Sequence, residues 1–296
     1  MANRKEIRTK ISSTRKTKKI TSAMKLVAAA KVSKIQKKLQ VSRPYTNKIS
    51  DLLANLLMSV SKDDLSEYPL LKSKAQIDKV LLVVHSSDRG LCAAYNTNII
   101  KATTKRINEL LKENKRVELV TIGRKATSAF SKTQWQEKGV KINKSFCNLE
   151  SMPKISEANI ITEHITKLFT ESHTDKVEII VTKFISMITN EIKISEFLPL
   201  TTNIPAKQIK SDPYVILDPD SAELINALVP MYLENSVYLN LIEAATSELA
   251  SRMTAMTNAT SNAEEVIKQL VLKSNKVRQA SITQEISEIV AGSAAV

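Results

Sequence analysis

Glycine and aromatic residues are scarce in this chain of 296 residues, which contains four glycines and only 4% aromatic residues. Few glycines leave few positions for tight turns, and few aromatics leave few bulky side chains to anchor a compact core. Residues 231–291 contain neither glycine nor proline. Because both residue types disfavour helices, their scarcity favours long helices over a compact enzyme.

Disulfide, membrane-span and signal patterns are also missing from the sequence. The two cysteines, Cys92 and Cys147, lie far apart, so a disulfide framework is not expected and a reduced, cytosolic setting fits. No apolar run approaches the roughly 18 residues of a membrane span, and the N-terminal MANRKEIRTK lacks the apolar core of a signal peptide. Asn3 and Glu6 fit a capping box, which predicts a helix from almost the first residue and argues against import into an organelle.

Positive charge is concentrated at the N-terminus. Residues 1–48 contain fifteen lysines and arginines against a single acidic residue, Glu6, so this segment carries a net charge of +14. The whole chain has 44 basic and 30 acidic residues, which gives the same +14, and residues 49–296 are therefore neutral in sum. A segment this basic predicts an acidic partner, which can be nucleic acid, anionic lipid or an acidic protein surface.

The C-terminal segment, residues 218–296, has the heptad pattern of a coiled-coil helix. One heptad position holds Leu228, Ile242, Leu249, Met256, Ala263, Leu270 and Val277, and the position three residues later holds Met231, Tyr238, Ala245, Ala259, Val266 and Ala280. Asn235, Arg252 and Lys273 interrupt this pattern, as register-setting or snorkelling residues do, and Arg252 is also placed to grip a carboxylate. The stretch without glycine or proline alone makes a helix of roughly 90 Å, which we expect to project beyond any globular part.

The N-terminal segment, residues 1–60, predicts a second long helix. Its apolar stripe consists of Ile20, Met24, Ala28, Val32, Ile35 and Leu39, and lysines occupy the other faces. Pro44 is expected to kink or interrupt this helix, and the apolar pattern resumes at Ile49.

Residues 75–200 alternate between strand and helix patterns, which predicts an α/β domain. Strands are expected at 80–85, 116–122 and 177–184, and helices at about 96–113, 124–138 and 156–172. Residues 139–148 fit a short strand less clearly, and Thr189-Asn190 is a turn candidate that leads into a strand at 191–198. This alternation indicates a mainly parallel sheet covered on both faces. Residues 201–217 are interpreted as a linker, after which Asp218-Pro219 starts the C-terminal helix and Pro230 is expected to bend it.

The order of these segments constrains the topology. Two long helices with apolar stripes flank one α/β domain, and the economical way to bury both stripes is to pair the helices with each other. Because the domain lies between them in the sequence, the pair must be antiparallel. The C-terminal helix is longer and should extend past its partner over residues 267–296, where apolar side chains require a socket in another protein.

Catalytic and metal-binding patterns do not emerge. His85, His164 and His173 are isolated from one another and from the cysteines, so structural or surface roles are expected for them. The sequence SSDRG at residues 86–90 follows the first strand, where α/β sheets often bind ligands, but one glycine is too few for a dinucleotide fingerprint. We expect a capped loop with Asp88 and Arg89 in local hydrogen bonds, and a docking surface is the alternative.

Three sequence strings resemble a known family. KEIRTKISSTRKTKKITSAMKLVAAAK near the N-terminus, SDRGLC after the first strand, and SELASRMTAMTNAT with KVRQASITQEISEIVAGSAAV near the C-terminus are similar to the gamma subunits of F-type ATP synthases, of the bacterial type. They span essentially the whole chain in the order of that family. One departure is visible, because the family usually has two glycines where Ala93 and Ala94 stand.

The resemblance implies a fold and a role. The fold is a long antiparallel coiled coil of the N- and C-terminal helices with a Rossmann-like α/β domain between them. The role is that of a rotor shaft inside a ring of alpha and beta subunits, with a foot that rests, beside the epsilon subunit, on the c-subunit ring at the cytoplasmic face of the bacterial inner membrane. Catalysis of ATP chemistry belongs to the beta subunits in this family, so no cofactor, nucleic acid or small-molecule ligand is expected for this chain.

The resemblance also assigns residues to contacts. Met24 and Lys25 match positions near an acidic loop of the beta subunit, and Arg252, Gln279 and Thr283 match positions that engage a beta-subunit catch. Asp88, Arg89 and Asp218 match the foot near the c-ring and the epsilon subunit.

Two other functions compete with this interpretation. A basic helix on a coiled coil can bind nucleic acid, but residues 1–44 contain no aromatic residue to stack on bases. The α/β domain alone suggests a nucleotide-binding enzyme, but the sequence has neither a glycine-rich phosphate loop nor an acid–base pair.

Overall fold

A computed structural model describes residues 4–59, 68–74, 76–200 and 221–294 of the chain. These residues divide into two compact units, one made of Met1–Ala29 with Arg252–Val296 and the other of Ala30–Ser251. We call the first the helix-pair unit and the second the domain unit. The linker predicted at 201–217 and Asp218 lie outside the described residues.

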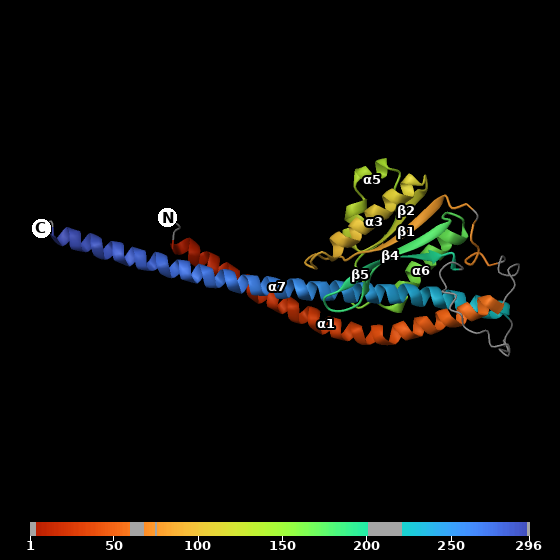
Figure 1. Ribbon diagram of the computed structural model, residues 1–296, viewed down its shortest axis with the longest axis horizontal. Helices are drawn as coiled ribbons and strands as arrows, with labels where there is room; N and C mark the ends of the chain where they lie inside the picture. Colours follow the sequence, from red (N-terminus) through yellow and green to blue (C-terminus); the bar gives the residue numbers. More distant parts are fainter. Residues whose placement is uncertain (1–3, 60–67, 75, 201–220, 295–296) are drawn as a thin grey trace. The chain divides into compact units, whose positions relative to one another are not determined.

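A five-stranded sheet forms the centre of the domain unit (Figure 1). Its strands are β1 (Lys79–His85), β2 (Arg116–Ile122), β3 (Lys141–Phe146), β4 (Lys176–Phe184) and β5 (Asn190–Leu198), in the spatial order β3-β2-β1-β4-β5. All neighbours are parallel except β4 and β5, which form an antiparallel hairpin. The predicted mainly parallel sheet is confirmed, and the less clear segment 139–148 contains β3.

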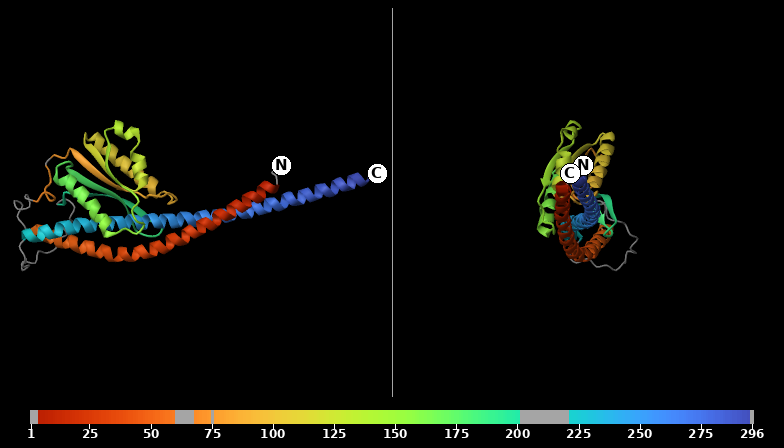
Figure 2. Two further views of the ribbon diagram at one scale, coloured as in Figure 1. Left: turned by 180° about the vertical axis from the view of Figure 1, so that it is seen from behind. Right: turned by 90° about the vertical axis from the view of Figure 1, so that its left-hand side faces the viewer.

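Helices cover both faces of the sheet, as the sequence predicts. On one face α3 (Tyr95–Lys112), α4 (Arg124–Phe130) and α5 (Thr133–Glu137) pack on inward side chains such as Leu82 and Val84. On the other face α6 (Ile155–Thr170) and the domain-unit parts of the two long helices pack on Leu81 and Val83, and Figure 2 shows α6 on this face. Successive residues of β1 face opposite sides of the sheet because side chains alternate along a strand. The helix predicted at 124–138 is two short helices, because Lys132 between them has an extended backbone.

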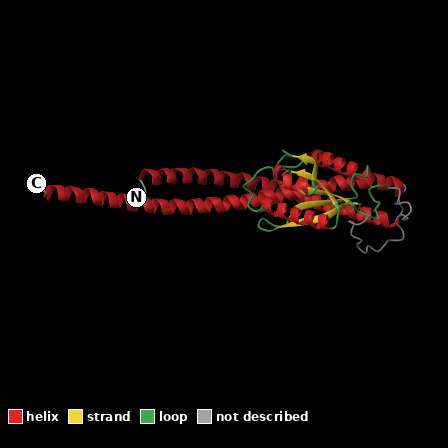
Figure 3. Ribbon diagram, turned by 90° about the horizontal axis from the view of Figure 1, so that it is seen from above, coloured by secondary structure: helices red, strands yellow, loops and turns green. Residues whose placement is uncertain are grey.

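The two long helices run without interruption through their prolines. Helix α1 (Arg4–Ser59) contains Pro44 and helix α7 (Ser221–Ala294) contains Pro230. Figure 3, which colours helices red, shows both as continuous ribbons. Of the two effects expected of Pro44, a kink or an interruption, the interruption does not occur. Both prolines are exposed, so the backbone carbonyl that each leaves without its helical donor is on the solvent side and can bond to water.

Contacts between α1 and α7 in the helix-pair unit establish their antiparallel direction, and the two helices also meet in the domain unit. In the helix-pair unit the hydroxyl oxygens of Thr21 and Thr260 lie 2.8 Å apart, and Lys18 Nζ lies 3.3 Å from Glu264 Oε2. In the domain unit Arg43 pairs with Glu243. In the helix-pair unit a later residue of α1 thus meets an earlier residue of α7, as predicted.

The apolar seam of the helix-pair unit differs from the predicted seam by one residue at half of its positions. On α7 Met256 and Ala263 are buried as predicted, but Val266 is 42% exposed. The positions that face the partner instead are one residue later and include Thr260 and Ile267. On α1 Ile20 is 60% exposed while Thr21 is buried. A 3.5-residue repeat fixes the spacing of a seam, but either of two adjacent residues can fit it, and the partner helix decides between them.

The end of α7 carries exposed apolar residues. Every described side chain from Ile282 to Ser293 is exposed within the helix-pair unit. This group includes Ile282, Ile286, Ile289 and Val290, whose exposed fractions range from 46% to 70%. The expected extension of the C-terminal helix beyond the described start of α1 is confirmed.

Candidate functional site

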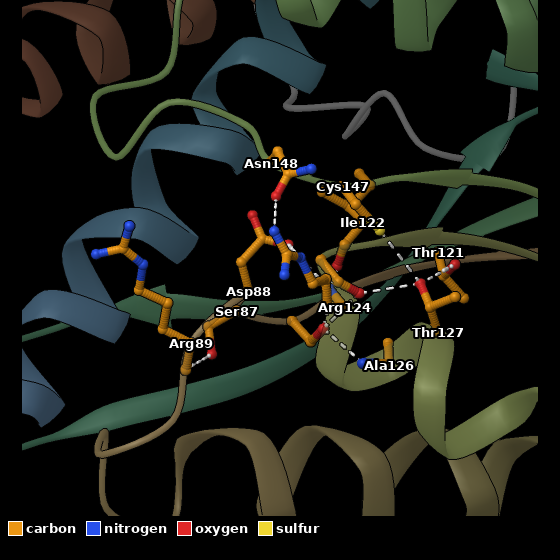
Figure 4. A network of polar contacts seen from close by, with 12 residues as sticks. Ser87, Asp88, Arg89, Thr121, Ile122, Arg124, Ala126, Thr127, Cys147 and Asn148 are labelled. Carbon is orange, nitrogen blue, oxygen red and sulfur yellow. Dashed lines mark hydrogen bonds and ion pairs between the residues drawn. The ribbon is translucent and has the colours of Figure 1, made fainter.

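The loop after β1 closes on the start of α4 at the carboxyl edge of the parallel strands (Figure 4). Asp88 Oδ1 accepts a hydrogen bond of 3.0 Å from the backbone N–H of Arg124, and Ser86 Oγ accepts one of 2.8 Å from the backbone N–H of Ala126. The backbone N–H of Lys125 donates to the carbonyl of Ser87 at 3.1 Å. The loop therefore caps α4 with its own polar groups, and the expected local hydrogen bond of Asp88 is confirmed.

Gly123 allows this close approach between the β2–α4 turn and the loop. It has a positive φ of 90°, and a Cβ atom there would lie 2.2 Å from the carbonyl oxygen of Ser86. Any other residue would meet both the backbone strain and the overlap. The sequence contains this glycine, but nothing in the pattern around it reveals the contact with Ser86.

The second half of the loop is held by Ser87 and Asn96. The backbone N–H of Ser87 donates to Asn96 Oδ1 at 3.0 Å, and Ser87 Oγ donates to the carbonyl of Arg89 at 2.6 Å. The Arg89 side chain is exposed. Local bonding at the Arg89 backbone is therefore confirmed, and the docking role of its exposed side chain stays a prediction.

Ala93 occupies a backbone conformation that favours glycine. Its φ is 48°, in the left-handed region, whereas Ala94 has a φ of −82°. The family that the sequence resembles usually has glycine at both positions. The chain therefore keeps the left-handed turn at position 93 despite the alanine, at a cost of roughly 1–2 kcal/mol.

The same contacts bear on the nucleotide-binding alternative. Phosphate groups in α/β proteins bind to free backbone N–H groups at the start of a helix. In α4 the N–H groups of Arg124, Lys125 and Ala126 already donate to the chain's own oxygen atoms. This loop is built as a closed turn and not as a phosphate cradle.

The three histidines occupy separate environments. Burial lowers the pKa of His85 to about 4, despite the opposing charge of Asp88. His164 Nε2 lies 2.9 Å from Asn143 Oδ1. Burial, and to a lesser degree the charges of Lys144 and Lys167, lower the pKa of His164.

Within the described residues no group of three or more His, Cys, Asp or Glu side chains is arranged to hold a metal ion. None of the described helices is both long and apolar enough to cross a membrane.

A buried ion pair lies between α3 and the sheet, which sequence analysis did not identify. Arg106 donates to both carboxylate oxygens of Glu178, at 2.8 and 2.7 Å, and Glu178 is 3% exposed. Burial opposes the charge on Glu178, but the hydrogen bonds and charge of Arg106, with help from Lys176, outweigh it and lower the pKa of the carboxyl group. Arg106 and Glu178 are 72 positions apart in the sequence, so no local pattern reveals the pair.

The residues assigned to beta-subunit contact lie at two separate places along the helix-pair unit. Met24, Lys25 and Arg252 are half-buried, and the register set by Thr21 and Thr260 places Lys25 opposite Met256, about one turn from Arg252. Gln279 and Thr283 are exposed and are spaced to share one face of α7. Since Gln279 follows Arg252 by 27 residues, roughly 40 Å of helix separates the two places. The structure thus brings together the first three residues and keeps the last two apart from them.

The fold and these surfaces define a class of protein. It is an α/β protein whose two chain ends form an antiparallel helical pair, with a closed loop at the sheet edge and exposed side chains along the helices. An open groove on the pair is lined by Arg8, Ile11, Ser12, Arg15, Val271, Ser274 and Asn275. Such a surface suits contact with other macromolecules better than enclosure of a small substrate.

Comparison with known proteins identifies the family. The sequence model described as ATP synthase matches residues 3–296. The ATP synthase gamma chain of Synechococcus sp. strain WH7803 is 41% identical over 322 aligned positions, which cover all of both chains. That of Rippkaea orientalis is 39% identical over 317 positions and 99% of each chain. The chain belongs to the ATP synthase gamma-chain family.

Solved structures share its fold. A chain of the Euglena gracilis mitochondrial ATP synthase aligns with a TM-score of 0.69 over 99% of this chain and 94% of its own length, at 19% identity. A chain of the Tetrahymena thermophila mitochondrial ATP synthase, from a structure of the central stalk and c-ring, aligns with a TM-score of 0.59 over 81% of this chain and 99% of its own, at 24% identity. These comparisons give the nucleic-acid-binding alternative no support.

Proposed function

We propose that this chain is the central rotor shaft of an F-type ATP synthase. In this role it couples rotation of a c-subunit ring to ATP synthesis or hydrolysis at the beta subunits. The observation that carries the proposal is the antiparallel pairing of the two chain ends, joined at Thr21 and Thr260, together with membership in the gamma-chain family. A pair of helices resists bending and twisting better than a single helix does. A shaft that transmits rotation must resist both deformations.

The two ends of this rotor have different partners. The helix-pair unit enters the hexamer of alpha and beta subunits, where Met24, Lys25 and Arg252 contact beta subunits and Gln279 and Thr283 contact them nearer the end of α7. The domain unit forms the foot, which contacts the epsilon subunit and the c-ring through Asp88, Arg89 and Asp218. The subunit itself is non-catalytic and peripheral, and it lies at the cytoplasmic face of the bacterial inner membrane.

The charge and burial patterns support this arrangement. Residues 1–48 carry a net charge of +14, which suits an acidic beta-subunit loop. The exposed isoleucines at 282, 286 and 289 suit an apolar sleeve that surrounds the end of α7 without gripping it by hydrogen bonds.

Arg252 offers a direct test in a complex reconstituted from this chain with alpha, beta and epsilon subunits and a c-ring. Arg252→Ala should lower ATP-driven proton pumping at least several-fold, because a charge-assisted contact with a beta-subunit carboxylate is lost. Lys273→Ala is the matched control, since Lys273 is an exposed cation on the same helix and in the same unit. Proton pumping and ATP hydrolysis are measured on the same vesicles.

The results distinguish the contact role of Arg252 from the rotor role of the whole chain. Loss of pumping with Arg252→Ala but not with Lys273→Ala supports the contact role of Arg252. Equal pumping by both variants and the unaltered chain removes that role. If the unaltered chain does not co-purify with three alpha and three beta subunits, or pumps no protons, the rotor proposal itself is wrong.

A further inference from the structure

Three residues from three elements form a closed hydrogen-bonded ring in the domain unit, which we call the Phe184 junction. Arg43 of α1 and Glu243 of α7 form an ion pair with a distance of 2.9 Å between Nε and Oε1. Arg43 Nη2 also donates to the backbone carbonyl of Phe184. The backbone N–H of Phe184 donates to Glu243 Oε2 at 3.2 Å. One residue at the end of β4 is thereby bound to both long helices at once.

Further contacts fix the same end of the β4–β5 hairpin to α7. Ser247 Oγ donates to the carbonyl of Thr182 at 3.2 Å, and Asn190 Nδ2 donates to Ser251 Oγ at 3.3 Å. The Phe184 side chain, 6% exposed, packs in a cluster contributed by both helices. The buried helical members of this cluster are Val32, Ile35, Leu39, Ile242, Ala245, Leu249 and Ala250. Figure 1 shows the hairpin beside α7 on this part of the domain unit.

The chemistry of the junction makes it specific in orientation. The Glu243 side chain is only 8% exposed, and its two oxygens are bound by different elements, one by Arg43 and the other by Phe184. A guanidinium group is planar and presents its donors in a fixed fork, so it holds the helix and the strand end at one mutual angle. Apolar packing alone lets a helix turn about its axis more easily than this set of directed bonds does.

All three residues of the junction belong to the domain unit. The division falls between Ala29 and Ala30 on α1 and between Ser251 and Arg252 on α7. Ser251 and Val32, which contact Asn190 and the Phe184 cluster, lie on the domain side of this division.

We infer that the Phe184 junction transmits torque from the α/β domain to both helices of the shaft, with Arg43 and Glu243 as positioning residues that prevent the helices from turning against the sheet. The inference rests on the proposed rotor function and adds the place where rotation of the foot becomes rotation of the helix pair. It requires no contact of the junction with a partner subunit.

The test compares two conservative arginine variants in the reconstituted complex. Arg43→Lys keeps the positive charge but cannot reach Glu243 and the Phe184 carbonyl with a planar fork. Arg106→Lys is the matched control, because it disturbs an equally close Arg–Glu pair in the same domain that touches neither long helix. Protons pumped per ATP hydrolysed, and the torsional stiffness of the shaft in single-molecule rotation, are measured for both.

For Arg43→Lys we expect a fall of at least twofold both in protons pumped per ATP and in the torsional stiffness of the shaft. Arg106→Lys should lower thermal stability and leave both quantities unchanged. An unchanged ratio in Arg43→Lys, or an equal fall in Arg106→Lys, overturns the inference. Should Arg43→Lys fail to assemble, Asn190→Ala removes only the bond to Ser251 and should show a smaller fall in the same direction. No change there also overturns it. Pumping by the unaltered chain tests the rotor function separately from these outcomes.

Discussion

Two parts of the same helix, α7, differ sharply in what surrounds them. Between residues 241 and 250, in the domain unit, nine of the ten side chains are buried. Between residues 252 and 293, in the helix-pair unit, Met256 and Ala263 are the buried side chains among those described. The first part is surrounded by sheet and helix, and small residues such as Ala244 and Ala250 allow the close approach. The second has one narrow seam, so a single substitution removes much less of its contact area.

The difference teaches that stability and function are divided along the chain. In the domain unit the packed interior and its ion pairs hold one arrangement of strands and helices. In the helix-pair unit most described side chains are exposed or half-buried, and the helices pair along one seam. Substitutions should therefore act on folding in the first unit and on partner contacts in the second.

The largest effect is expected from Gly123→Ala in the domain unit. A Cβ atom at this position would lie 2.2 Å from the backbone carbonyl oxygen of Ser86, in addition to the strain of a φ of 90°. We expect a loss of more than about 3 kcal/mol in the free energy of unfolding. The measurement is guanidinium unfolding of the full chain followed by fluorescence of Trp135, the single tryptophan, which is buried in the domain unit.

Gly139→Ala is its matched control. Gly139 also has a positive φ, 78°, but no atom of the described residues lies within 4 Å of the place that a Cβ atom would take. Strain alone should then cost roughly 1–2 kcal/mol. Equal losses in the two variants would mean that the contact with Ser86 does not matter and that the loop can move away.

An intermediate effect is expected when one side chain in each of the two parts of α7 is replaced by alanine. Ile242→Ala removes a fully buried side chain and should cost about 3 kcal/mol by Trp135 fluorescence. Val266→Ala, at a position 42% exposed, should change stability by less than about 0.5 kcal/mol, because the higher helix propensity of alanine offsets the small loss of contact. Circular dichroism follows the helix-pair unit in the same samples. A large loss of helix in Val266→Ala would show that the predicted seam, and not the observed one, is correct.

The smallest effect is a pH dependence confined to the domain unit. The pKa of Glu178 lies below its usual value of 4.5 in the folded chain. A lowered folded pKa stabilises the fold fully above the unfolded pKa, and this contribution is lost as the pH falls through the folded pKa. The free energy of unfolding, followed by Trp135 fluorescence, should therefore fall as the pH falls below about 4.5. Glu178→Gln should make the free energy of unfolding less dependent on pH in that range.

The helix-pair unit should respond less to acid. Its pair between Lys18 and Glu264 has side chains 37% and 51% exposed, and such pairs contribute about 0–1 kcal/mol to stability.

If Glu178→Gln leaves the acid dependence of the free energy of unfolding unchanged, other carboxylates of the domain unit are responsible. Asp175 is one of them, because its hydrogen bonds lower its pKa against the opposing effect of burial.

Much of the fold was predictable because local patterns carry it. The apolar run at Val80–Val84 predicts β1, the turn at Thr189-Asn190 predicts the entry to β5, and the absence of glycine and proline from 231–291 predicts an unbroken α7. The closed loop at Asp88 was also expected from its sequence. The sequence around Pro44 left a kink and an interruption open, because the effect of a helical proline depends on whether its side of the helix faces water or protein.

The sequence by itself determined which segments are strands and helices, where the basic charge lies and to which family the strings at both ends are similar, since each is a property of neighbouring residues. Only the tertiary structure decided that Thr21 and Thr260, and not Ile20 and Ala259, face each other, because two adjacent residues fit a heptad repeat until a partner helix selects one. It also decided that Arg43, Phe184 and Glu243 meet. Those residues are separated by up to 200 positions, and directed bonds over such separations follow from the packing of whole elements, which no local pattern encodes.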